Sequence, residues 1–289
     1  MRFNPKKKSR VNVLGVSMAY VEAGKGDPIV FVHGNPTSSY LWRKIIPEVS
    51  SQGRCIAPDL IGMGDSAKIG EGSEAYRFRV HRRYLESFLE VKGIESNVTL
   101  VGHDWGGALA FDWARRHPEA VKAIVYMETI VTPITWSDWP ESAARAFQGM
   151  RSSAGEEMIL DKNFFVERIL PSSVLAPLSE ETMTEYRKPF REPGESRRPT
   201  LTWPREIPID GEPKDVEEIV ALNQAWLEST ALPKLFINAD PGSILVGRVR
   251  EVCRGFPNQT EVTVPGIHFI QEDSGTQIGN SIAEFLRRL

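Results

Sequence analysis

Residues 98–107, VTLVGHDWGG, place a strand-like apolar run directly before a glycine-rich turn and the start of a helical pattern. Gly102, Gly106 and Gly107 surround an aspartate at position 104. Glycine lets the backbone turn steeply and lets neighbouring segments approach closely. The stretch therefore predicts a sharp strand-to-helix turn that presents the Asp104 side chain beyond the end of a sheet.

Strand-like runs alternate with helical patterns along most of the chain. The runs PIVFV at 28–32 and KAIVYM at 122–127 are apolar on both faces, which is typical of central strands in a parallel sheet. Such alternation predicts an α/β fold with a mostly parallel, doubly wound sheet, covered by helices on both faces. The first two runs, split near Gly15, are expected to form an antiparallel hairpin at one edge. Ligands of such sheets bind beyond the carboxyl ends of the strands.

The alternation stops between about residues 132 and 214, where aromatic helical stretches and several prolines replace it. Strands resume only at Leu235. We therefore expect a main domain made of residues 1–131 and 215–289, with a helical cap (lid) at 132–214 inserted between two strands. Because the insertion leaves the sheet at its carboxyl edge, it can cover a site there.

Composition excludes several classes of partner. Hydrophobic residues make up 41% and charged residues 25% of the 289 residues, and the formal net charge is −3. This balance gives no reason to expect a nucleic acid or an anionic membrane as partner. No apolar run is long enough to span a bilayer, and the basic start does not resemble a secretory signal. The two cysteines form no disulfide framework or metal motif. We expect a cytoplasmic protein without metal or cofactor, either a monomer or a weak homo-oligomer.

Asp104 is a candidate nucleophile. An aspartate is an anion at neutral pH, so it needs no base to activate it, and it can displace a leaving group from saturated carbon to form an ester. Aspartate also caps helix N-termini well, and that is the alternative interpretation. The partners that follow downstream favour a catalytic role.

A base and an orienting acid are expected near the same edge of the sheet. His268, in VPGIHFIQED, follows the last predicted strand and is the only late histidine, which makes it the candidate base. His81 and His117 are expected on the surface. Two carboxylates can orient His268: Glu128 follows the strand after the turn, and Asp240 follows the penultimate strand. Position along the chain does not decide between them.

Two donors are predicted beside Asp104. The loop HGNPTSS at 33–39 follows the strand PIVFV, so the backbone N–H groups of Asn35 and Trp105 can form an oxyanion hole. The Asn35 amide and the Trp105 indole are hydrogen-bond donors but not acids. They suit a leaving group, such as a halide, that departs without a proton. An epoxide would benefit from acidic hydroxyls, and epoxide hydrolases of similar architecture generally use a pair of lid tyrosines, whereas this cap holds only Tyr186.

The chain resembles a known family over its length from about residue 15 to the end. The segments HGNPTSSYLWR, PDLIGMGDS, HDWG, FDWARRHPE, NFFVERILP, RRPTLTWPREIPI and HFIQEDS closely resemble haloalkane dehalogenases of the α/β-hydrolase superfamily. The segment YMETI is similar to the acid segment of the branch that uses an Asp-His-Glu triad. The resemblance implies that Glu128 is the acid, with Asp240 as an alternative or supporting carboxylate.

The same resemblance implies hydrolysis of haloalkanes to alcohol, halide and a proton through an alkyl ester on Asp104. The partners would be a small apolar halogenated substrate, water and a halide ion, with Asn35 and Trp105 binding the halide. The pocket positions implied by the resemblance are Trp139, Phe147, Phe165, Trp203, Pro204, Ile207, Ile244 and Ile267. Ser173 stands at a cap position that is expected to be apolar.

A second family resembles the chain over the same length. The coelenterazine-dependent luciferases of cnidarians, which are cofactor-independent monooxygenases, have a similar triad and a similar cap segment. Pro36 in HGNPTSS and the weakly acidic segment ITWSDWPESA are more similar to the dehalogenases. Oxygenase activity is therefore the alternative function, and epoxide hydrolysis is a more remote one.

Overall fold

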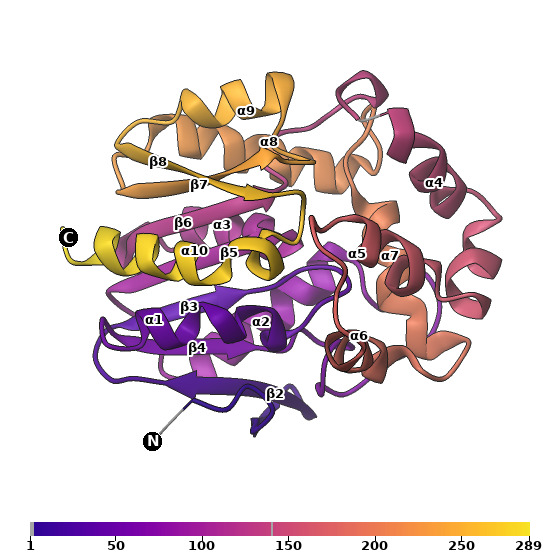
Figure 1. Ribbon diagram of the computed structural model, residues 1–289, viewed down its shortest axis with the longest axis horizontal. Helices are drawn as coiled ribbons and strands as arrows, with labels where there is room; N and C mark the ends of the chain where they lie inside the picture. Colours follow the sequence, from indigo (N-terminus) through magenta and orange to yellow (C-terminus); the bar gives the residue numbers. More distant parts are fainter. Residues whose placement is uncertain (1–2, 140) are drawn as a thin grey trace.

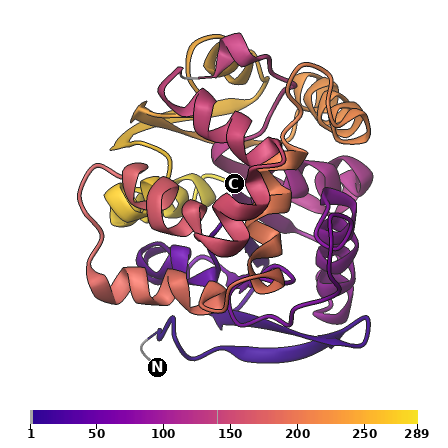
Figure 2. The same ribbon diagram turned by 90° about the vertical axis from the view of Figure 1, so that its right-hand side faces the viewer.

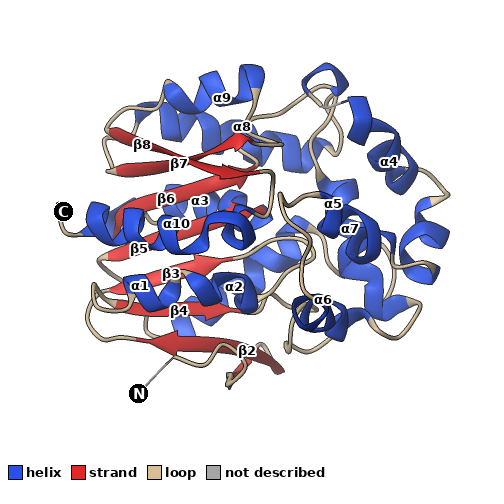
Figure 3. Cartoon of the chain, in the orientation of Figure 1, coloured by secondary structure: helices blue, strands red, loops and turns tan. Residues whose placement is uncertain are grey.

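An eight-stranded sheet forms the centre of the structure, a computed structural model that describes residues 3–139 and 141–289 (Figures 1 and 3). The strand order is β1-β2-β4-β3-β5-β6-β7-β8. The strands are β1 (Ser9–Val13), β2 (Val16–Ala23), β3 (Pro28–Val32), β4 (Arg54–Pro58), β5 (Val98–Asp104), β6 (Val121–Thr129), β7 (Lys234–Pro241) and β8 (Gln259–Gly266). Strands β1 and β2 form an antiparallel edge hairpin, β2 is also antiparallel to β4, and all later pairs are parallel. The predicted α/β architecture is confirmed.

Helices cover both faces of this sheet. They are α1 (Ile46–Val49) and α10 (Ile270–Leu286) on one face, and α2 (Phe78–Val91), α3 (Trp105–Arg116), α8 (Lys214–Ser229) and α9 (Gly247–Arg254) on the other. Single 3-10 turns lie at Ser39–Lys44 and Pro118–Ala120.

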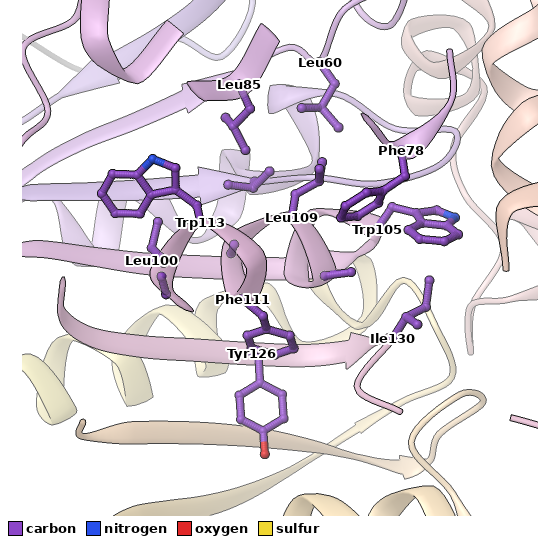
Figure 4. Close-up of a cluster of buried hydrophobic side chains, with 14 of the residues drawn as sticks. Leu60, Phe78, Leu85, Leu100, Trp105, Leu109, Phe111, Trp113, Tyr126 and Ile130 are labelled. Carbon is purple, nitrogen blue, oxygen red and sulfur yellow. The ribbon is translucent and has the colours of Figure 1, made fainter. Parts of the chain in front are cut away.

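Two hydrophobic cores follow from the alternation of side chains along the strands. In β6, Ala123 and Val125 face the core under α1 and α10, whereas Ile124 and Tyr126 face the core under α3. Figure 4 shows part of the second core, in which side chains of α3 pack beside Tyr126, and Trp105 lies at its end. Both faces of the central strands are therefore apolar, as their sequences indicate.

Between β6 and α8 the chain forms a helical segment, residues 130–213, that we call the helical insert. Its helices are α4 (Glu141–Arg151), α5 (Leu170–Ser172), α6 (Glu180–Arg187) and α7 (Arg198–Glu206), with π-helical turns at Glu157–Asp161 and Phe165–Ile169 and 3-10 turns at Trp136–Asp138, Lys188–Phe190 and Glu195–Arg197. The insert lies beyond the carboxyl ends of the parallel strands (Figure 1), and Figure 2 looks onto it. Among the described residues, no helix is both long enough and apolar enough to cross a membrane.

Candidate active site

Asp104 is the last residue of β5 and stands on a strained turn. Its φ and ψ of 53° and −133° lie in a region that L-residues rarely adopt. A Cβ on Gly102 would lie 2.4 Å from the Cα of Gly107, and a Cβ on Gly106 would lie 2.0 Å from the carbonyl oxygen of Val32. Only glycine fits these two positions, so the glycines around Asp104 are required by the sharp turn from β5 into α3.

The Asp104 carboxylate is buried and does not cap its helix. Within the described chain its side chain makes no N-cap hydrogen bond, and the backbone N–H of Trp105, the first residue of α3, is one of the groups that stabilise the anion. Oδ1 accepts the backbone N–H of Asn35 at 2.7 Å, and Oδ2 lies 3.6 Å from Nε2 of His268. Burial works against the anion, but the neighbouring His268 outweighs it and holds the pKa of Asp104 below its usual value. Asp104 is therefore an anion at neutral pH.

His268 belongs to the loop that joins β8 to α10, and its ring lies between two carboxylates. Its Nε2 faces Asp104, and its Nδ1 lies 3.4 Å from Oε2 of Glu128. Burial disfavours the imidazolium, but hydrogen bonding and charge attraction from Asp104 and Glu128 prevail and raise the pKa of His268 to about 9. The two neighbouring carboxylates therefore favour the protonated form of His268 in the resting site.

Glu128, at the end of β6, is fully buried and fixed by the loop that follows β7. Its carboxylate accepts backbone N–H groups from Ser243, Ile244 and Leu245 at 3.1, 2.8 and 3.3 Å. Asp240 is exposed at the end of β7, and within the described residues no hydrogen bond or ion pair joins it to His268. Glu128, the acid that the family resemblance favoured over Asp240, is therefore the one beside His268.

The loop after β3 brings Asn35 against the nucleophile. A Cβ on Gly34 would lie 2.1 Å from Oδ1 of Asp104, so the close approach of this loop requires glycine. Asn35 is 2% exposed, and neither the nitrogen nor the oxygen of its side-chain amide has a hydrogen-bond partner among the described residues. A buried amide with free donors next to a cavity is ready to bind a ligand.

His33 fixes this loop from behind. Its Nε2 accepts the N–H of Leu60 at 2.8 Å, so Nδ1 carries the proton and donates to the carbonyl of Gly34 at 2.9 Å. Burial lowers the pKa of His33 to about 4, which keeps the ring neutral. His33 therefore supports the loop and does not serve as a second base.

A cavity of about 670 Å³ opens in front of these side chains. Asn35, Asp104, Trp105 and His268 line one end of it. Of the pocket positions expected from the sequence, those that line it are Trp139, Phe147, Phe165, Pro204, Ile207, Ile244 and Ile267. Ser173 lines it as well, so one wall carries a hydroxyl where an apolar side chain was expected. Most of the surrounding side chains are apolar, as in sites that bind small apolar ligands.

Trp203 is placed differently from the expectation that it lines the pocket. It is fully buried, it does not belong to the cavity lining in the described chain, and its ring stacks on Trp105 with centroids 4.7 Å apart. The ring of Trp203 also stacks on His81, with centroids 4.2 Å apart. His81 is also fully buried, so the prediction that it lies on the surface is wrong. Trp203 supports Trp105 from behind.

Sequence reasoning missed several residues of the cavity. They are Ile130, Ile134, Asp138, Ala143, Ala146, Ile169, Ser172, Gly242, Ser243, Val246 and Val249. Ile130 directly follows β6, and residues 242–246 follow β7, so their positions at strand ends were a usable signal. The missed residues of the helical insert gave no such signal, because the helices of the insert are short and irregular.

The fold and the turn at Asp104 define the class of protein. The family model for the alpha/beta hydrolase fold matches residues 27–274. The chain belongs to this family.

Among the described residues, no group of three or more histidine, cysteine, aspartate or glutamate side chains could hold a metal ion.

Closer relatives narrow the class. The chain is 55% identical to a haloalkane dehalogenase of Sphingobium indicum over 283 residues, which cover 98% of this chain and 96% of that protein. The crystal structure of haloalkane dehalogenase DbeA from Bradyrhizobium elkani superposes with a TM-score of 0.93 at 42% identity, covering 98% of both chains. A coelenterazine h 2-monooxygenase of Renilla reniformis is 42% identical over 97% of this chain and 90% of its own. Within the α/β-hydrolases the chain is thus a member of the haloalkane dehalogenases.

Proposed function

We propose that this protein hydrolyses the carbon–halogen bond of small haloalkanes to an alcohol, a halide ion and a proton. One observation carries the proposal: an ionised, buried Asp104 shares the end of an apolar cavity with an Asn35 amide whose donors are unused. The anion is a nucleophile that needs no activation, and the amide can receive an anion that leaves without a proton.

In the first step the carboxylate of Asp104 attacks the carbon that bears the halogen. Oδ1 is held by the N–H of Asn35, so Oδ2 is the oxygen free to attack. The new C–O bond forms as the C–X bond breaks, and the halide leaves with the electron pair. The Asn35 amide and the Trp105 indole stabilise the departing charge. Trp105 is backed by Trp203 and Phe78, which keeps its ring in place.

In the second step His268 activates water. The alkyl ester carries no charge, so His268 loses one of the two anions that raise its pKa, and its proton is released more readily. The neutral imidazole takes a proton from water while Glu128 stabilises the imidazolium that forms. Hydroxide attacks the ester carbonyl, whose developing charge lies on the oxygen beside the Asn35 N–H. Collapse releases the alcohol and restores Asp104.

The two parts of the chain contribute different parts of the proposed site. We assign residues 1–131 and 215–289 to the main domain and residues 132–214 to a cap. The main domain contributes Asp104, Glu128 and His268, whereas Trp139, Phe147 and other insert residues supply cavity walls. Apolar walls exclude water from the first step and favour an apolar substrate.

The arrangement of Tyr186 argues against epoxide hydrolysis. Tyr186 is 2% exposed, and its hydroxyl donates to Glu272 at 2.5 Å. Within the described chain it does not line the cavity. No tyrosine hydroxyl is therefore available there to protonate an epoxide oxygen.

The test is halide release from 1-bromobutane, run beside light emission with coelenterazine. Halide without light supports the proposal, whereas light without halide would assign the chain to the monooxygenase activity of its Renilla relative. The variant His268→Ala then tests the two steps. It should release one halide per site and retain the alkyl group on Asp104, visible as a mass increase of the intact protein.

A further inference from the structure

The main chain of His268 is held on both sides. Its N–H donates to the carbonyl of Ser173 in the helical insert at 3.1 Å, and the N–H of Phe269 donates to the same oxygen at 3.1 Å. Its own carbonyl accepts a hydrogen bond from Nε2 of His103 at 2.9 Å. Burial lowers the pKa of His103 to about 3, so this ring is a neutral donor. The base is therefore anchored to the insert as well as to the sheet.

Asp273, in the first turn of α10, joins the same two segments through its side chain. Its Oδ1 accepts the N–H of Leu175 in the insert at 2.9 Å, and its Oδ2 accepts the N–H of Ile267 at 3.3 Å. Ile267 directly precedes His268 and lines the cavity. One half-buried carboxylate thus connects the insert to the loop that carries the base.

We infer that Asp273 is a positioning residue for His268. The inference rests on the function proposed above. An acid in the first turn of a helix can also act through the helix dipole alone, but that role does not require either oxygen to accept an N–H from outside the helix. Here both oxygens do so, and the two donors belong to segments far apart in the sequence.

The geometry of the triad makes this positioning necessary. Nε2 of His268 lies 3.6 Å from Asp104, which is an ion-pair distance too long for a hydrogen bond, and Nδ1 lies 3.4 Å from Glu128, longer than an ordinary hydrogen bond. A small displacement of the loop would take the ring out of reach of one or both carboxylates. Misplacement of a reacting group by about 1 Å can cost about a hundredfold in rate.

The two chemical steps depend on Asp273 to different degrees. Alkylation uses Asp104, Asn35 and Trp105, none of which is hydrogen-bonded to Asp273. Hydrolysis of the ester uses His268, whose loop Asp273 ties to the insert. Loss of the carboxylate should therefore slow hydrolysis much more than alkylation.

The experiment compares Asp273→Ala and Asp273→Asn with the wild type during reaction with excess 1-bromobutane. The alanine variant loses both acceptors, whereas the asparagine variant keeps one and is close in size, which protects folding. Glu284→Gln is the matched control, because Glu284 is an exposed acid on the same helix. Rapid quenching followed by halide assay and intact-mass measurement gives the rate of each step.

The expected result is a slowing of ester hydrolysis by about tenfold in Asp273→Ala and about threefold in Asp273→Asn. Alkylation should change by less than about twofold, and the alkylated protein should accumulate as it does in His268→Ala. Because halide release in the first turnover counts only competent sites, loss of folded protein does not imitate this result. Glu284→Gln should behave as the wild type.

Equal slowing of both steps, or an unchanged rate of ester hydrolysis per competent site, would overturn the role of Asp273. Failure of the proposed function looks different. In that case the wild type and Glu284→Gln would release no halide from 1-bromobutane at all. Halide release by these two proteins with normal turnover by both Asp273 variants would leave the proposed function intact and remove only the inference.

Discussion

The two ends of the cavity are built in different ways. At the sheet end, polar side chains come from the ends of β5 and β6 and from the loops after β3 and β8. Asp104 and Glu128 accept backbone N–H groups, the loop of Asn35 depends on a glycine for its close approach, and the main chain of His268 is hydrogen-bonded to Ser173 and His103. At the insert end, most of the wall is made of apolar side chains, such as Phe147 on α4 and Phe165 on a π-helical turn. The sheet end therefore supplies the reacting groups, whereas the insert supplies most of the apolar wall that surrounds them.

The largest effect should come from the sheet end. Asp104→Asn removes the anionic nucleophile, so halide release should fall by at least about a thousandfold. Asp240 is an exposed acid at the end of β7, two strands away from β5 in the sheet, so Asp240→Asn should retain most activity. The measurement is halide release from 1-bromobutane by both variants at equal concentrations of folded protein. Comparable losses would show that position at a strand end, and not the strained turn, is what matters.

Removing the charge of Glu128 should have the next largest effect. Glu128→Gln leaves a group of the same shape that cannot stabilise the imidazolium, so ester hydrolysis should slow by about a hundredfold or more. Alkylation should be less affected, because Asp104 stays ionised. Single-turnover kinetics would separate the two steps. If Asp240→Asn slows hydrolysis more than Glu128→Gln does, the assignment of the acid must be reversed.

The two steps should also respond differently to pH. Asp104 has a lowered pKa and His268 a pKa of about 9 in the free enzyme, so alkylation should be nearly constant from weakly acidic pH up to that value. Hydrolysis needs a neutral imidazole, so its rate should rise with pH and level off below pH 9, because the ester no longer holds the proton on His268. Rapid-quench measurements across this range provide the test. A hydrolysis rate that falls as pH rises would contradict His268 as base.

Changes at the insert end should be the smallest and should act on binding. Phe147→Ala removes apolar surface from the wall, so the KM for 1-bromobutane should rise about fivefold with little change in kcat. Leu222 is an exposed apolar side chain on α8, so Leu222→Ala is the control for truncating an apolar side chain away from the cavity and should leave KM unchanged. Steady-state halide release gives both constants. A fall in kcat comparable to that of Glu128→Gln would mean that the insert takes part in the chemistry.

Features that depend on local sequence patterns could be predicted, whereas features that depend on distant contacts could not. The strands, their alternation with helices and the turn at Asp104 depend on local patterns, so they could be located before the structure was known. The choice between Glu128 and Asp240 could not be made from position along the chain, because both lie at strand ends on the same edge of the sheet, and only the family resemblance favoured Glu128. The choice depends on three N–H groups at 243–245 that reach Glu128 from a distant loop.

Long-range packing also explains the error at His81. The segment RVHRRYLE is rich in charge, which is typical of an exposed helix face. The structure buries His81 because Trp203, from the insert, stacks on its ring. For the same reason Trp203 lies behind Trp105, although its neighbour Pro204 lines the cavity. Contacts between segments more than 100 residues apart leave no local signature.

The passage of the chain through the insert between β6 and α8 divides the reacting groups by order of synthesis. Asn35, Asp104 and Glu128 all precede the insert, and His268 follows it. A chain cut within the insert would leave the nucleophile Asp104 on one fragment and the base His268 on the other. Neither fragment alone could complete a cycle, so repeated halide release from a mixture of the two would report that the halves had reassembled.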